Sequence, residues 1–177
     1  KTKVVYKSSI FPADIDCVFS LLRNLETLQY IAKPYASFTP IGGNSNIRWE
    51  EGQTISFKFK LFCFIPYGTH TIHVIDFSKH SIYTNESNTY VPVWNHKILL
   101  NALPDGTTEY SDEVEIGAGW KTIFVWLWAS VSIRIGKKGD VPFCKEITFI
   151  FQCPGGGQSR AETACRKIGL AENPILQ

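Results

Sequence analysis

The chain lacks the long apolar run of a membrane protein. No stretch approaches the roughly 20 apolar residues that a membrane-spanning helix needs, and the first residues show no secretory-signal pattern. We therefore expect no integral membrane segment and a cytoplasmic location. A hydrophobic content of 44% and a charged content of 19% over 177 residues are ordinary for one globular domain with a sizeable core.

Signatures of nucleotide, redox and metal sites are also missing. The Pro-Gly-Gly-Gly at 154–157 is not followed by the Gly-Lys-Ser/Thr of a phosphate-binding loop, and no Gly-x-Ser-x-Gly nucleophile motif is present. The five cysteines are widely spaced, without a Cys-x-x-Cys pair. We expect Cys17 and Cys63 to be small core residues in a reducing compartment. No cofactor and no metal are expected.

The net charge of +2 comes from the end of the chain. Residues 134–177 hold seven of the 18 Lys and Arg and four of the 16 Asp and Glu, which leaves 11 basic and 12 acidic residues in 1–133. The main body is thus close to neutral. It carries no basic stripe of the kind that binds nucleic acid, so we expect no nucleic-acid partner.

The first forty residues predict a strand and two helices. Residues 3–10 read as a strand, and apolar residues then recur at helical spacing from Ile15 to Leu25 behind a potential N-cap at Asp14. A second short helix over residues 28–32 is expected to stop before Pro34, because proline disfavours a helical residue ahead of it.

A series of strands follows. Clear alternation or strand-like composition predicts strands at 55–61, 69–76, 81–87, 92–101 and 107–116, with Pro66 and Gly68 as a turn. Short connections between them favour an antiparallel meander.

The pattern becomes helical after Gly119. Apolar residues recur at helical spacing as an unbroken stripe: Trp120, Ile123, Phe124, Leu127, Trp128 and Val131. We expect this stripe to pack against the sheet, whose apolar face needs a partner. Trp126 falls outside the stripe and is expected to be a contact surface.

Two ionisable residues share the apolar faces of neighbouring strands. His96 has the parity of Trp94 and Ile98, and Asp112 has the parity of Tyr110 and Val114, so we expect both to point inward and to meet. On the preceding strand, Ile82, Thr84 and Glu86 share a face, which adds a second carboxylate.

Three interpretations of the His96–Asp112 pair stay open. It is a polar anchor in an apolar cavity, an acid/base pair, or an internal hydrogen bond that fixes strand register. The other histidines are weaker candidates. His70 and His73 have opposite parity on one strand, so they cannot point to one face as two metal ligands, and His80 is expected in a solvated turn.

The predicted ligand-binding residues lie on inward-facing strand positions or on the helix stripe. They are Phe57, Phe59, Thr84, Glu86, Trp94, His96, Tyr110, Asp112, Trp120 and Phe124. The candidate catalytic residues are His96 and Asp112.

Several segments resemble the SRPBCC superfamily, which includes START-type lipid-binding domains, pollen-allergen-like proteins and polyketide cyclases. The resemblance is strongest to small bacterial members of unassigned function and covers roughly residues 3–131. It rests on the order and spacing of IFPADIDCVF (10–19), EGQTISFKFKLFCFIPYGTH (51–70), IYTNESN (82–88), VWNH (93–96), YSDEVEIGAGWKT (110–122) and VWLWA (125–129).

The resemblance implies an α+β helix-grip fold: a curved antiparallel sheet of six or seven strands around a long C-terminal helix, with two short helices after the first strand. It implies that the cavity between sheet and helix binds or carries a hydrophobic or amphipathic small molecule. We expect the volume of roughly 300–1,000 Å³ that is typical of such sites. The alternatives are a cyclase- or hydrolase-like enzyme using His96 and Asp112, and an interaction module without a ligand.

The end of the chain departs from the family pattern. Similar proteins continue the last helix with an aromatic, basic segment resembling FYxHRQKRW, whereas this chain reads SIRIGKKG over 132–139. With suitable codons, the same nucleotides read one position earlier encode Phe-Tyr-Pro-His-Arg-Gln-Lys-Arg. We hypothesise that everything after Val131 is out of frame, so that 1–133 is the helix-grip domain and 134–177 a frameshifted or disordered basic tail. The alternative is a genuine tail with a short helix at 159–168, and the coding DNA decides between them.

Overall fold

The computed structural model describes residues 1–32, 35–43 and 46–135. The predicted tail lies outside these residues from position 136 on, as do the short helix at 159–168 and the hypothesis of a changed reading frame there. Within the described residues, no helix is long and apolar enough to cross a bilayer.

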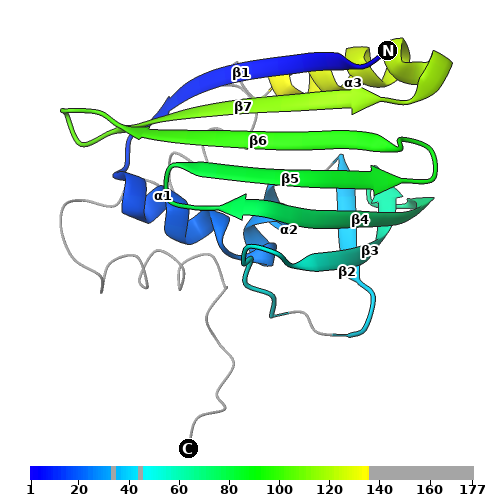
Figure 1. Cartoon of the computed structure of the whole chain (residues 1–177), viewed down its shortest axis with the longest axis horizontal. Coiled ribbons are helices and arrows are strands. Elements are labelled where there is room, and N and C mark those ends of the chain that lie inside the picture. The colour runs from blue at the N-terminus through cyan, green and yellow to red at the C-terminus, as the bar shows by residue number, and fades with distance from the viewer. Residues whose placement is uncertain (33–34, 44–45, 136–177) are drawn as a thin grey trace, which may run out of the picture.

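In the described part of the chain, seven strands form one antiparallel sheet with the order β1-β7-β6-β5-β4-β3-β2 (Figure 1). The strands are β1 Lys3–Phe11, β2 Ala36–Pro40, β3 Thr54–Leu61, β4 Ile65–Phe77, β5 Ser81–Asn88, β6 Val93–Ala102 and β7 Thr108–Gly117. The six strands predicted individually are confirmed. The seventh, β2, was missed because its five residues show little apolar alternation; it pairs with β3 at the edge of the sheet.

The helices are α1 Ile15–Leu22, α2 Leu25–Ala32 and α3 Thr122–Ile135, and a 3₁₀ turn at Gly119–Lys121 precedes α3. As predicted, Asp14 caps α1, since its carboxylate accepts the Cys17 N–H at 2.9 Å. The prediction that the first helix reaches Leu25 is wrong. The Leu25 N–H donates to the Ile47 carbonyl, and the Trp49 N–H donates to the Arg23 carbonyl, so backbone bonds to residues 47–49 separate the two helices.

The turn predicted at Pro66 and Gly68 is also wrong. The β3–β4 turn occupies residues 62–64, where Phe62 and Cys63 adopt left-handed φ values of 50° and 65°. Pro66 lies at the start of β4, beside a register shift in β3, where a missing N–H is tolerated. Cys63 is half-buried in this turn rather than a core residue, whereas Cys17 packs against the core as expected.

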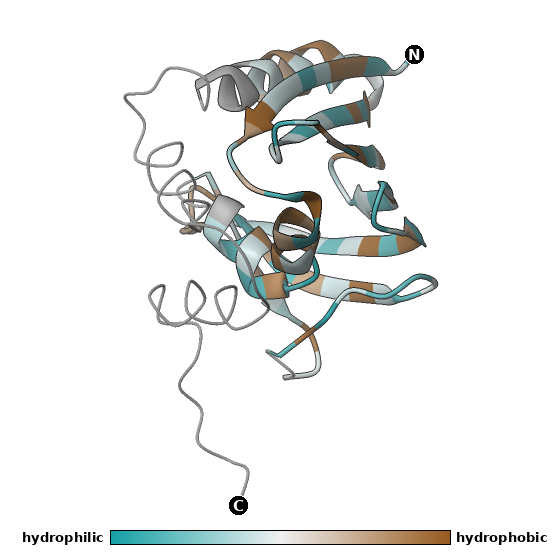
Figure 2. Ribbon diagram, turned by 90° about the vertical axis from the view of Figure 1, so that its left-hand side faces the viewer, coloured by the Kyte–Doolittle hydropathy of each residue, from teal (hydrophilic) through white to brown (hydrophobic). Residues whose placement is uncertain are grey.

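All three helices pack on the same face of the sheet, which curves around them (Figure 2). This concave face carries three clusters of buried apolar residues. The α1 cluster holds Ala13, Ile15, Val18, Leu21, Ile82, Ile98 and Leu100. The α2 cluster holds Leu25, Trp49, Phe57, Ile72 and Val74. The α3 cluster holds Val5, Val114, Ile116 and Ala129.

Helix α3 presents a different face to the sheet from the one predicted. Trp120 is 79% exposed and Phe124 63% exposed, and Ile123 and Leu127 are exposed as well. The buried face instead includes Ala129, whose small side chain allows close approach to the α3 cluster.

Trp126, which was expected to lie outside the packing stripe, attaches α3 to the edge of the sheet. Its indole N–H donates to the Val4 carbonyl of β1 at 2.9 Å, and Lys3 Nζ lies 4.7 Å from its ring centroid. The helix is apolar on nearly every side, so spacing alone could not identify the buried face.

Candidate binding site

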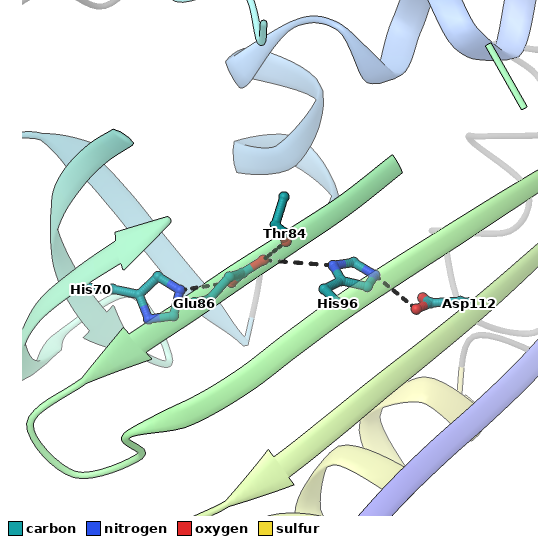
Figure 3. A network of polar contacts seen from close by, with 5 residues as sticks. All are labelled: His70, Thr84, Glu86, His96 and Asp112. Atoms are coloured by element: carbon teal, nitrogen blue, oxygen red, sulfur yellow. Dashed lines mark hydrogen bonds and ion pairs between the residues drawn. The ribbon is translucent and has the colours of Figure 1, made fainter. Parts of the chain in front are cut away.

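Four ionisable side chains form a line across the concave face, one from each of β4, β5, β6 and β7 (Figure 3). His70 Nε2 lies 2.8 Å from Glu86 Oε2, and His96 Nε2 lies 2.7 Å from Asp112 Oδ1. Between the two pairs, His96 Nδ1 is 3.8 Å from Glu86 Oε1. The Thr84 hydroxyl donates to Glu86 Oε1 at 2.7 Å. We call these five residues the central network.

The strand register explains why these side chains meet. Thr84 is paired with His96, and Glu86 is paired with Ile72, two positions from His70. Asp112 is paired with Ile98, two positions from His96 on β6. Because side chains alternate between faces, these positions all point to the concave side and lie within reach of their diagonal neighbours.

The central network lies where the three apolar clusters meet. On β6, His96 stands between Trp94, which packs against the α3 cluster, and Ile98 of the α1 cluster. On β7, Asp112 likewise lies between Tyr110, which packs against the α1 cluster, and Val114 of the α3 cluster. On β4, His70 precedes two residues of the α2 cluster. The network is therefore a polar centre with apolar surroundings.

The charge of His96 is stabilised by its neighbours. Burial by itself lowers the pKa of His96, but the Asp112 carboxylate, its hydrogen bond and the Glu86 carboxylate together raise that pKa from 6.5 to about 9. His96 is thus an imidazolium at neutral pH, with a carboxylate near each ring nitrogen. Burial also raises the pKa of Tyr110 well above 10, and the charge of Asp112 and its hydrogen bond with the phenol act in the same direction.

The network is more open at one end than at the other. The side chains of His96 and Asp112 are 26% and 18% exposed, whereas those of His70 and Glu86 are both 10% exposed. Lys7 of β1 is directly opposite Asp112 in the register and so shares the concave face. Among the described residues, no group of three or more His, Cys, Asp or Glu is arranged to hold a metal ion.

Most of the residues predicted to bind a ligand lie in or beside the network. The predicted meeting of His96 with Asp112 is confirmed, and Glu86 and Thr84 join them. The aromatic residues Phe59, Trp94 and Tyr110 are half-buried around the network. Phe57, which is paired with His70 in the β3–β4 register, is fully buried in the α2 cluster.

Two predicted lining residues lie elsewhere. Trp120 and Phe124 form an edge-to-face pair on the exposed side of α3, with ring centroids 6.4 Å apart. The expectation that they face the sheet is wrong because α3 is rotated towards Trp126 and Ala129.

His70 was not predicted to be a member of the site. It is buried, bonds to Glu86, and has the rings of Phe38 and Phe59 at 5.6 and 5.4 Å. One signal was available: His70 has the same parity as the buried Ile72 and therefore belongs to the inward face of its strand.

Comparison with known proteins identifies the fold. No family model matches the chain, and no curated protein matches it in sequence. Solved structures do match. Protein CV1439 from Chromobacterium violaceum aligns with a TM-score of 0.56 and 12% identity over 74% of this chain and 92% of its own. The chain has the helix-grip fold.

Two further structures are similar at the same level. A protein from Nitrosospira multiformis aligns with a TM-score of 0.53 and 15% identity over 89% of this chain and 99% of its own. Ara h 8.0201 aligns with a TM-score of 0.51 and 12% identity over 75% of this chain and 93% of its own. At such low identity, these similarities show a shared fold and no shared activity.

Proposed function

We propose that the protein binds or carries a hydrophobic or amphipathic small molecule on the concave face of the sheet, and that the central network holds the polar group of that molecule. The proposal includes membership of the SRPBCC superfamily and a cytoplasmic location. The aromatic rings of Phe59, Trp94 and Tyr110 supply the apolar lining next to the network.

The position of the network is the observation that carries this proposal. Charged groups among apolar side chains cost desolvation free energy, and apolar residues of similar volume at the same positions are often neutral or stabilising. His96 and Asp112 nevertheless lie between apolar clusters while they remain 26% and 18% exposed. A few polar groups converging within apolar surroundings are typical of sites for small molecules.

Native mass spectrometry of the full chain purified from its own cells tests the proposal. We expect a non-covalent adduct that extracts into organic solvent. The same adduct should remain on Lys97→Gln, since Lys97 is exposed on the opposite face of β6. It should be lost from the double variant His96→Leu/Asp112→Leu, which removes both charges together and leaves neither one unpaired.

Two results would contradict the proposal. A wild-type chain that carries no adduct would support an interaction module without a ligand. An adduct retained equally by the double variant would show that the central network does not hold the molecule. Circular dichroism of each variant confirms that any loss of adduct does not come from unfolding.

The 2.7 Å contact between His96 and Asp112 favours a second candidate, a cyclase- or hydrolase-like enzyme. With a pKa of about 9, His96 suits a general acid better than a general base at neutral pH. The molecule recovered by mass spectrometry is then incubated with wild type and His96→Gln. Turnover at an unchanged rate in the variant would exclude His96 as the acid.

A further inference from the structure

Three connections lie together at one end of the sheet, on the right in Figure 1. The turn between β3 and β4, the connection between β5 and β6, and the junction between β7 and α3 all lie at this end because the strands alternate in direction. We call residues 62–67, 89–92 and 118–124 the aromatic end.

The aromatic end exposes large apolar side chains. Phe64 is 72% exposed and Trp120 79% exposed, and five more are exposed to a lesser degree: Phe62, Ile65, Tyr90, Ile123 and Phe124. Contiguous apolar surface of this kind usually marks a site of interaction, because leaving it in water is unfavourable.

Ring contacts join the three connections into one surface. The rings of Tyr67 and Tyr90 are 4.6 Å apart, which joins the β3–β4 hairpin to the β5–β6 connection. Lys121 Nζ lies 5.9 Å from the Tyr90 ring and 5.6 Å from the Trp120 ring, and Trp120 packs against Phe124. The Lys121 ammonium therefore lies beside two of the exposed rings, those of Tyr90 and Trp120.

The charge of this end has a single sign. Residues 61–69, 88–93 and 117–125 contain no Asp or Glu, and Lys121 is their one charged residue. The connections at the opposite end differ, since they contain Asp14, Lys79 and Asp105. Exposed aromatic rings beside a lysine, without a carboxylate, are complementary to an apolar layer beneath anionic groups.

We propose that the aromatic end docks on the surface of an anionic phospholipid bilayer. Trp120, Phe124 and Phe64 enter the boundary between headgroups and acyl chains, and Lys121 remains at the level of the phosphates. A symmetric pair of copies joined through this surface would bring the two Lys121 ammonium groups towards each other, which disfavours a second copy as the occupant. The proposal does not depend on what the central network binds.

Co-sedimentation of the full chain with vesicles tests the docking. We expect the wild type to pellet with vesicles of phosphatidylcholine and phosphatidylglycerol and much less with phosphatidylcholine alone. Trp120→Ser and Phe64→Ser should each weaken the partition about tenfold, because each removes one large apolar side chain from the contact. The matched control is Ile10→Ser, which changes a side chain that is 66% exposed in β1, and it should bind like the wild type.

Several outcomes would overturn the proposal. One is a wild type that stays in the supernatant. Another is equal binding by wild type and Trp120→Ser, which would assign the binding to the basic residues of 134–177. A third is self-association without vesicles that Trp120→Ser abolishes, which would make a second copy the occupant. Quenching of tryptophan fluorescence by brominated lipid gives a separate readout. We expect this quenching to fall markedly in Trp120→Phe.

Discussion

At the centre of the concave face, charged side chains lie among apolar clusters, whereas at the aromatic end large apolar side chains face water. Neither arrangement favours folding, because buried charges and exposed apolar surface both cost free energy. Phe59 lies between the two regions, with its ring 5.4 Å from His70 and 6.1 Å from Tyr67. Both regions are therefore the places where we propose contacts with other molecules.

The largest loss in the free energy of unfolding is expected where an aromatic ring is used for packing alone. Phe57→Ala removes a fully buried ring from the α2 cluster and should lower the free energy of unfolding by about 3–5 kcal/mol, measured by urea denaturation. An effect below about 1 kcal/mol would show that this part of the concave face is not a packed core.

Breaking the central network should lower the free energy of unfolding by somewhat less than Phe57→Ala does. Asp112→Leu leaves the His96 imidazolium without its partner at 2.7 Å and should destabilise the fold by about 3 kcal/mol. Adding His96→Leu should restore most of this loss, because the unpaired charge is then gone. A double variant as unstable as the single one would contradict the idea that pairing, rather than volume, matters at these positions.

The network should also make stability depend on pH. The folded-state pKa of His96 is raised from 6.5 to about 9, so its contribution is fully present below pH 6.5 and is lost as the pH rises through about 9. We expect a loss of about 3 kcal/mol across this window. His96→Gln should remove this slope. The raised pKa of Tyr110 affects stability separately, above pH 10.

The smallest change in the free energy of unfolding is expected at the aromatic end. Phe124→Ala removes a ring that is 63% exposed, so the free energy of unfolding should change by no more than about 0.5 kcal/mol. A loss as large as that of Phe57→Ala would show that this ring is used for packing, and the contrast between the two regions would disappear.

Strand alternation made the centre of the site predictable. Short connections place β6 and β7 side by side, and parity then puts His96 and Asp112 on one face. Predicting that His70 belongs to the site required more than strand parity. The bond from His70 to Glu86 depends on the register between β4 and β5, which a shift between Val74 and Asp76 interrupts, and nothing in the local sequence specifies that shift.

The orientation of α3 could not be predicted from spacing. A helix that is apolar on nearly every side offers more than one face for packing. The hydrogen bond from Trp126 to the Val4 carbonyl and the small size of Ala129 select one of them, and both depend on where β1 lies. The exposure of Trp120 and Phe124 follows from that selection.

Imidazole NMR provides the most direct test of a ligand at the central network. The chain isolated from its own cells is compared before and after a hydrophobic resin removes small molecules. The account predicts that the ring-nitrogen signals of His70 and His96 change, while those of the exposed His73 and His80 do not. Unchanged signals from His70 and His96 after a molecule has been removed, or equal changes at all four histidines, would contradict it.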